Sequence, residues 1–139
     1  RLVLENEDKG VWTPDMLHEL IHKPTGIPIT FDNLHHACNP GKLSEQQAFT
    51  LCHDSWLMHG VRPLFHYSEG GANNNPRAHT DFATMSPEEW LHRHVIYPHK
   101  YNVDWDIELK QKDYAINNIH DLEVRFDRQQ EKLLTEINN

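Results

Sequence analysis

Four short, mostly apolar segments of this chain each run directly into a side chain that can bind a metal ion. The segments occupy residues 2–5, 27–32, 61–66 and 103–108. The side chains that close them are Glu5, Asp32, His66 and Glu108. The first three segments have the pattern of strands buried on both faces, as in a parallel sheet. The fourth alternates, with Val103, Trp105 and Ile107 on one face and acidic residues on the other.

Helical patterns with clear start signals separate these strands. Thr13 and Pro14 predict a helix over residues 13–22 that stops before Gly26. Ser44 and Ser86 each begin a capping-box pattern. These patterns predict helices over residues 44–59 and 86–95, and a long amphipathic pattern predicts a last helix over residues 113–137.

The repeated strand-helix order predicts an α/β fold with a parallel sheet and helices outside it. The length of 139 residues suits a single domain over residues 1–139. An open doubly wound sheet and a closed (β/α)8 barrel both satisfy this order. Barrel enzymes gather their catalytic residues at the C-terminal ends of successive strands, and all four strands here end in such residues. The pattern therefore favours the barrel.

Glu5, Asp32, His35, His66 and Glu108 would meet at one edge of the sheet if the strands are neighbours. Histidine is unusually frequent, at 12 residues, and imidazole is the commonest metal ligand in proteins. A mixed carboxylate and imidazole set suits Mn²⁺, Zn²⁺ or Fe²⁺. Several close ligands fit a multi-metal site that hydrolyses phosphate esters.

The loop of residues 70–76 is rich in Gly and Asn, and it precedes two further candidates. From there His79 could approach the same site and Arg77 could meet a phosphate. The remaining histidines on predicted helices or at their ends are interpreted as outer-layer residues without a chemical role. They are His18, His22, His53, His59, His92, His94, His99 and His120.

The composition limits the class of protein. The formal net charge of −8 argues against a broad basic surface for nucleic acid, although bound cations would neutralise some carboxylates. We find no apolar run long enough for a membrane span and no secretion signal. Cys38 and Cys52 lack metal or redox spacing and are expected to be reduced thiols. We expect a cytoplasmic, nucleoid-associated protein, and the missing initial Met suggests an absent upstream segment.

The motifs together resemble the UV damage endonuclease family, whose members are (β/α)8 barrels related to endonuclease IV and xylose isomerase. The resemblance runs in order through most of the chain and covers the C-terminal half of the family barrel, about strands five to eight with their helices. The matching blocks are residues 4–9, 12–14, 31–36, 66–68 and 76–81.

The resemblance implies a metal-dependent DNA endonuclease that cuts the phosphodiester immediately 5′ of UV photoproducts and initiates excision repair. It implies a cluster of divalent ions, Mn²⁺ first and Zn²⁺ or Co²⁺ as alternatives, with damaged double-stranded DNA as partner. The implied metal ligands are Glu5, Asp32, His35, His66, His79 and Glu108. Of these, Glu5, Asp32, His66 and Glu108 are the implied catalytic residues. The residues expected to contact substrate are Arg77, Lys110, Lys112 and His36.

Two departures from the family pattern stand out. Many members carry a modified, metal-bridging lysine where this chain has Leu64, and the first half of the barrel is absent from these residues. We therefore expect little activity from this chain alone. Two alternatives stay open, a xylose-isomerase-like sugar isomerase or epimerase and an inactive barrel fragment. The oligomeric state is not predicted.

Overall fold

In the computed structural model of the chain, which describes residues 2–97 and 100–138, four parallel strands follow one another in chain order. Strand β1 (Leu4–Glu5) pairs with β2 (Ile29–Thr30), and β3 (Leu64–Tyr67) pairs with β4 (Asp104–Ile107). The two pairs meet through one parallel bridge between Asp32 and His66. The predicted parallel strand-helix alternation is confirmed, although the strands are shorter than expected.

Helices begin where the capping signals predict them, and the last helix follows the amphipathic pattern over residues 113–137. Helix α1 (Pro14–Leu17) continues through a π-helical segment (His18–His22) into α2 (Lys23–Thr25) and ends at Gly26, whose φ is 73°. Ser44 makes a complete capping box with Gln47, and Ser86 accepts a hydrogen bond from the backbone N–H of Glu89. The helices that follow are α4 (Glu45–Asp54), α5 (Pro87–His94) and α6 (Asp113–Ile137).

One helix, α3 (Asn33–Cys38), was not predicted. It begins because Oδ1 of Asp32 accepts a hydrogen bond from the backbone N–H of His35 at 2.7 Å, which satisfies one of the free donors of the first turn. A helix of 6 residues is too short to show an apolar periodicity in sequence.

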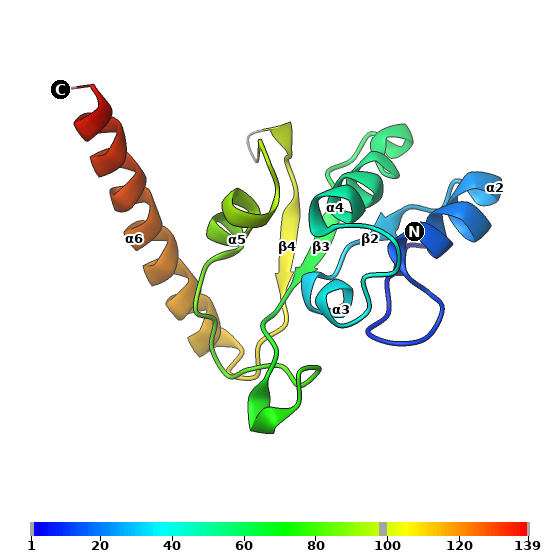
Figure 1. The fold of residues 1–139 in the computed structure, drawn as a ribbon, viewed down its shortest axis with the longest axis horizontal. Coiled ribbons are helices and arrows are strands. Elements are labelled where there is room, and N and C mark those ends of the chain that lie inside the picture. The colour runs from blue at the N-terminus through cyan, green and yellow to red at the C-terminus, as the bar shows by residue number, and fades with distance from the viewer. Residues whose placement is uncertain (1, 98–99, 139) are drawn as a thin grey trace.

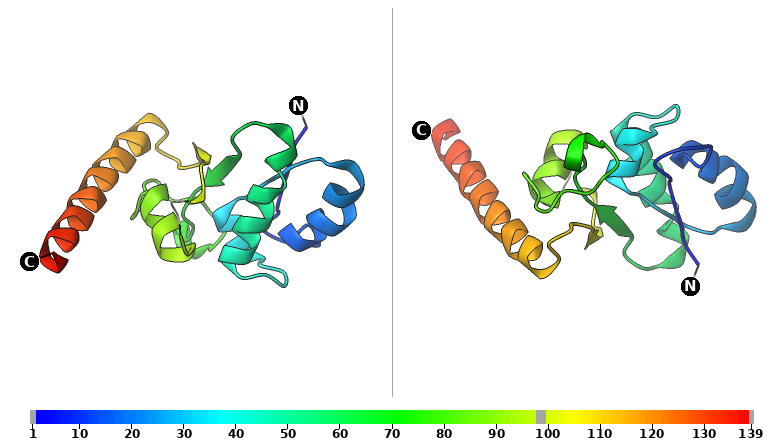
Figure 2. Two further views of the ribbon diagram at one scale, coloured as in Figure 1. Left: turned by 90° about the horizontal axis from the view of Figure 1, so that it is seen from above. Right: turned by 90° about the horizontal axis from the view of Figure 1, so that it is seen from below.

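Helices cover only one face of strands β3 and β4 (Figures 1 and 2). Phe65 and Tyr67 are fully buried on that face, whereas Leu64 on the opposite face is 44% exposed. The expectation that the third strand is buried on both faces is therefore wrong for the described residues. Leu2 in the first predicted strand is also exposed, and among the strands that the structure describes only the second has both faces buried.

An aromatic cluster forms the core between the covered face of the sheet and the helices α4 and α5. Phe49 of α4 lies at its centre, with ring centroids 5.1 Å from Phe65 and 5.6 Å from Phe31. Trp90 of α5 lies 6.1 Å from Trp105 of β4 in an edge-to-face arrangement. These pairs add to the burial of apolar surface and join both strand pairs to the same helices.

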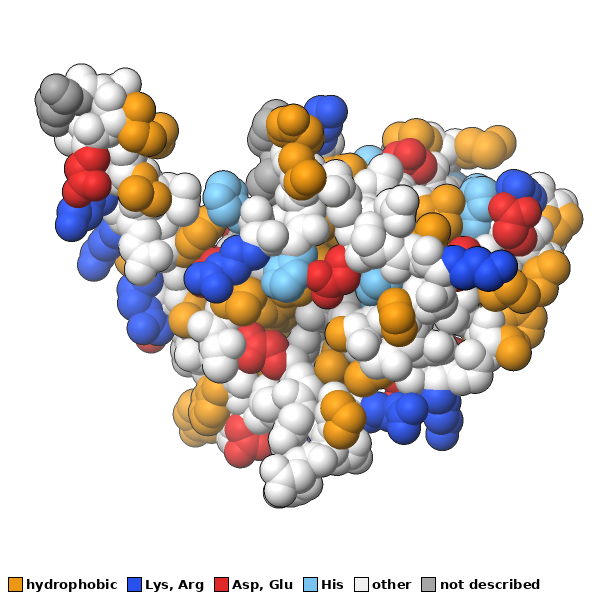
Figure 3. All heavy atoms as spheres, in the orientation of Figure 1, with side chains coloured by type: hydrophobic (Ala, Val, Ile, Leu, Met, Phe, Trp, Pro, Cys, Tyr) orange, Lys and Arg blue, Asp and Glu red, His pale blue; other side chains and the backbone are white. Residues whose placement is uncertain are grey.

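Helix α6 starts beside the carboxyl ends of the strands and then runs away from the rest of the chain (Figures 1 and 2). Ala115, Ile119 and Leu122 in its first half are buried, whereas Leu133 and Ile137 near its end are exposed. None of the described helices combines the length and apolar composition needed to cross a membrane. On the face seen in Figure 3, basic, acidic and apolar side chains are interspersed.

The aromatic cluster yields a stability prediction. Replacing Phe49, which is fully buried, by Ala should lower the free energy of unfolding by about 3–5 kcal/mol, because a large cavity forms in the core. Urea denaturation followed by circular dichroism measures the change. The control Met58→Ala, at a side chain 86% exposed, should change the stability by less than about 0.5 kcal/mol. Equal effects of the two substitutions would contradict this description of the core.

Candidate metal centre

Two buried asparagine side chains join the carboxyl ends of neighbouring strands. The amide of Asn6 donates to the backbone carbonyl of Asp32 at 3.1 Å and accepts from its N–H at 2.9 Å. The amide of Asn33 makes the same two bonds with the backbone of Ser68, both at 2.9 Å. These reciprocal bonds continue the strand pairing past the last backbone ladder bonds. They therefore fix the relative positions of the segments that follow β1, β2 and β3.

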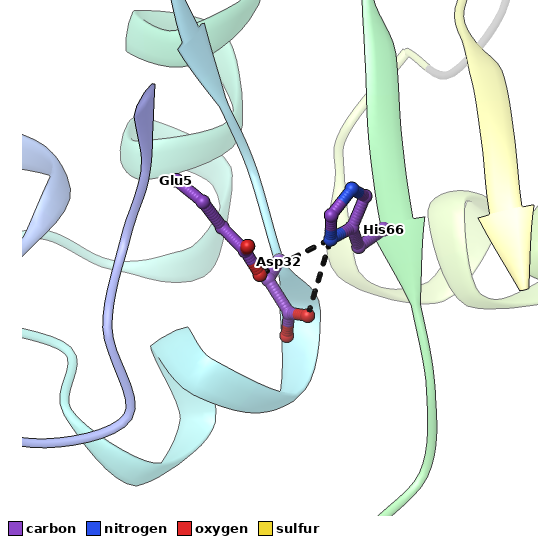
Figure 4. A group of neighbouring side chains, drawn as sticks. All are labelled: Glu5, Asp32 and His66. Carbon is purple, nitrogen blue, oxygen red and sulfur yellow. Dashed lines mark hydrogen bonds and ion pairs between the residues drawn. The ribbon is translucent and has the colours of Figure 1, made fainter. Parts of the chain in front are cut away.

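Glu5, at the end of β1, faces two histidines from the next two strand ends. Its Oε1 lies 3.1 Å from Nδ1 of His35 and 3.1 Å from Nδ1 of His66. Nδ1 of His35 also lies 2.8 Å from the backbone carbonyl of Asn6. Figure 4 shows the carboxylates of Glu5 and Asp32 turned toward the same nitrogen of His66. The predicted convergence of these strand-end side chains is present in the structure.

The two carboxylate oxygens of Asp32 have different surroundings, one at the start of a helix and one in the candidate metal centre. Oδ1 caps α3, while Oδ2 is buried and has no hydrogen-bond partner within the described part of the chain. Oδ2 lies 3.9 Å from Nδ1 of His35 and 4.0 Å from Nδ1 of His66. A buried carboxylate oxygen without a partner is costly, so a cation or a hydrogen-bond donor beside this atom would be stabilising.

Strand β4 places two further carboxylates next to His66. Oε1 of Glu108 lies 3.4 Å from Nδ1 of His66, and the backbone N–H of Glu108 donates to the carbonyl of Tyr67 at 2.9 Å. Asp106 is the register partner of His66. Sequence reasoning missed Asp106, although it shares the acidic face of the fourth strand with Glu108.

The charges of the centre are strongly coupled. Burial alone would raise the pKa of Glu5, but its hydrogen bonds with His35 and His66 outweigh burial and hold that pKa well below the usual range. Burial raises the pKa of Asp32 to about 6, against the hydrogen bond from the backbone of His35. The hydrogen bond to Glu5 raises the pKa of His35 to about 9 and also raises that of His66.

This donor set fits a divalent cation. One ligand atom from each of Glu5, Asp32 and His66 lies within 4.8 Å of the others, and the same holds for His66, Asp106 and Glu108. The partnerless Oδ2 of Asp32 belongs to the first group. Mixed carboxylate and imidazole ligands suit Mn²⁺, Zn²⁺, Co²⁺ or Fe²⁺.

His79 lies beside Glu108, but like His35 it is outside both compact groups found among the described residues. It follows β3 on a loop that pairs with Gly70, and it is half-buried. With Glu108, Lys110 and Lys112 it lines a hollow of about 360 Å³. Both lysines are exposed, so they remain available to an anionic ligand.

Two of the expected substrate contacts have other partners. Nε of Arg77 lies 3.3 Å from the carboxylate of Asp8, which ties the loop after β3 to the loop after β1. His36 is only 2% exposed, its ring lies 5.6 Å from that of Phe31, and its Nε2 lies 3.2 Å from the carbonyl of Leu43. A buried ring cannot contact a DNA duplex, so the assignment of His36 to substrate binding is wrong.

Several outer histidines have structural partners. Nδ1 of His22 lies 2.9 Å from the carbonyl of Ile27, and Nε2 of His59 lies 2.8 Å from that of Gly26. His94 stacks on Trp90. His99 lies outside the described residues.

Comparisons with known proteins agree on one family. The sequence model of UV-endonuclease UvdE matches residues 1–136. The UV DNA damage endonucleases of Bacillus cereus strains B4264 and G9842 are each 29% identical over 122 residues, which is 87% of this chain and 37% of the relative. The crystal structure of SacUVDE matches with a TM-score of 0.66 and 31% identity over 99% of this chain and 40% of that one. The chain thus spans well under half the length of these relatives.

The hydrogen bonds of Asn6 predict that its side-chain amide stabilises the position of Asp32 in the metal centre without being a metal ligand itself. Asn6→Ala leaves the buried backbone N–H of Asp32 without its partner, at a cost of about 1–3 kcal/mol, whereas the carbonyl of Asp32 keeps the hydrogen bond from the backbone N–H of His36. Chemical denaturation should show this loss of stability, and Mn²⁺ titration should show weaker binding. Asn117→Ala, at an exposed position on α6, is the control. Unchanged stability of Asn6→Ala would contradict the proposed role of the amide.

The electrostatics predict the pH dependence of metal binding. The pKa of His35 is about 9, so its ring is protonated at pH 7 and must lose that proton to bind a cation. Apparent affinity for Mn²⁺ should therefore increase as pH rises from 6 to 8, by about tenfold per pH unit for each proton released. Calorimetric titrations in buffers of different ionisation enthalpy count those protons. An affinity independent of pH would rule out His35 as a ligand.

Proposed function

The chain belongs to the UV-endonuclease UvdE family, and on that premise we propose that it forms the C-terminal half of a (β/α)8 barrel that incises UV-damaged DNA. The observation that carries this proposal is the meeting of Glu5, Asp32 and His66 beyond the carboxyl ends of three consecutive parallel strands. Barrel enzymes place their active sites at that end of the strands.

The proposed reaction is hydrolysis of the phosphodiester immediately 5′ of a UV photoproduct, leaving a 3′-hydroxyl and a 5′-phosphate. Divalent ions, with Mn²⁺ preferred and Zn²⁺ or Co²⁺ as alternatives, would supply an activated water and stabilise the developing negative charge. The proposed ligands are Glu5, Asp32, His35, His66, His79 and Glu108. Because such ions can generate the nucleophile, the protein needs no serine or cysteine for this chemistry.

The hollow beside Glu108 is the proposed position of the DNA backbone. Lys110 and Lys112 line it and are exposed, so their ammonium groups can approach phosphate oxygens. Arg77 lies on the loop after β3 and is half-exposed, with part of its guanidinium engaged by Asp8. Damaged nucleotides stack poorly, which lowers the cost of displacing them from the duplex toward such a site.

Family membership disfavours the sugar isomerase alternative, whereas Leu64 gives a specific reason to retain the inactive barrel piece. The side chain of Leu64 shares the open face of β3 with His66 and is 44% exposed, and it cannot bind a metal ion. An inactive piece should hold no divalent ion tightly. The metal content of the purified chain therefore distinguishes a metal-dependent endonuclease from an inactive barrel piece.

The proposal predicts incision that depends on both damage and metal. UV-irradiated and untreated supercoiled plasmids are incubated with Mn²⁺ and the chain, alone and extended upstream by the first half of a family barrel. The extended protein should nick only the irradiated plasmid, and the chain alone should show little activity. Glu5→Gln and His66→Ala should each reduce incision by roughly 100-fold or more, a larger effect than on DNA binding.

Glu19→Gln is the matched control for this assay, because Glu19 is an exposed carboxylate on the outer helices that pairs with Lys23. It should leave incision unchanged. Equal nicking of both plasmids by the extended protein, or none of either, would refute the repair-endonuclease proposal.

A further inference from the structure

We propose that Asp106 is a metal ligand that, together with Glu108, holds a second cation position beside His66. The inference rests on the proposed function and assigns a residue that the matching motifs do not include. It begins from strand geometry. Asp106 pairs with His66 in the parallel register of β3 and β4, and Glu108 follows two residues later on the same face. One ligand atom from each of the three lies within 4.8 Å of the others.

The two aspartates on β4, Asp104 and Asp106, differ in their partners, and this difference indicates which of them is free to bind a metal ion. Asp104 forms an ion pair with Arg62, at 2.7 Å from Oδ1 to Nη1. For Asp106, the described residues provide no hydrogen bond or ion pair, and its side chain is exposed on the open face. An aspartate that lies beside an imidazole and another carboxylate, and has no cationic partner, is available to a metal ion.

Ligand chemistry explains why a second position needs Asp106. The first group, Glu5, Asp32 and His66, shares His66 with the second. A neutral imidazole offers one lone pair, whereas a carboxylate offers two oxygens with several acceptor sites. If His66 serves an ion held by Glu5 and Asp32, the ion on the other side depends on carboxylates from β4.

The surroundings of Asp106 support this division. Asp106, Glu108 and His79 line the same hollow, so a further imidazole lies on that side of the site. Strand β3 offers no other ligand there, because the residue preceding His66 on the open face is the apolar Leu64. The carboxylate next to His66 in the sheet is therefore that of Asp106, from the neighbouring strand β4.

Metal stoichiometry tests the inference without any measurement of activity. Mn²⁺ binding to the chain is counted by calorimetry and by the electron paramagnetic resonance signal of the free ion. The wild-type chain should bind two ions, and Asp106→Asn should lose one or weaken it at least tenfold. Asp104→Asn, which makes the same charge change on the same face of β4, should retain both. Circular dichroism verifies that each variant is folded.

Two results would overturn the inference. One is a wild-type chain that binds fewer than two ions, and the other is an Asp106→Asn chain with wild-type stoichiometry and affinities. Failure of the proposed function gives a different pattern, in which the wild-type chain binds two ions, Asp106→Asn loses one, and the extended protein does not discriminate irradiated plasmid. The ligand assignment and the incision activity are thus tested separately.

Discussion

The position of Asp32 is the constraint on which the candidate centre depends. Its backbone is joined to β1 by the Asn6 amide and to β3 by the bridge with His66. One carboxylate oxygen starts α3, and the other lies buried among Glu5, His35 and His66 without a hydrogen-bond partner in the described residues. A single residue thus connects strand pairing, a helix start and the site. Its side chain has little freedom to move away from the metal ligands around it.

This arrangement accumulates negative charge that the protein alone compensates only in part. Asp32 is buried close to Glu5 and Glu108, and both neighbours raise its pKa in addition to the effect of burial. Protonation of His35 and His66 offsets some of that charge, and the hydrogen bonds to Glu5 favour it by raising the pKa of His35 to about 9 and by raising that of His66. Divalent cations can replace those protons, which couples metal binding to proton release. The same cations would attract phosphate to a chain whose formal net charge is −8.

Local chemistry explains which features the sequence predicts. Strand ends are visible because apolar runs stop at polar residues, and the starts of α4 and α5 are visible because Ser44 and Ser86 supply caps. Helix α3 is not visible because its 6 residues are too few to show an apolar periodicity, and the Asn33–Ser68 bonds are not visible because they join residues far apart in the chain. The burial of His36 is not visible because it depends on the packing of its ring against Phe31 in the core. Asp106 could have been found from the alternation that places it beside Glu108.

Anomalous diffraction from crystals grown with Mn²⁺ tests the central claim most directly, which is that the partnerless Oδ2 of Asp32 marks a cation site. The account predicts an anomalous peak within coordination distance of that oxygen, with Glu5 and His66 as co-ligands. A Mn²⁺-saturated crystal with no peak beside Asp32, in which Oδ2 instead accepts a hydrogen bond from a protonated histidine or a water, would contradict it.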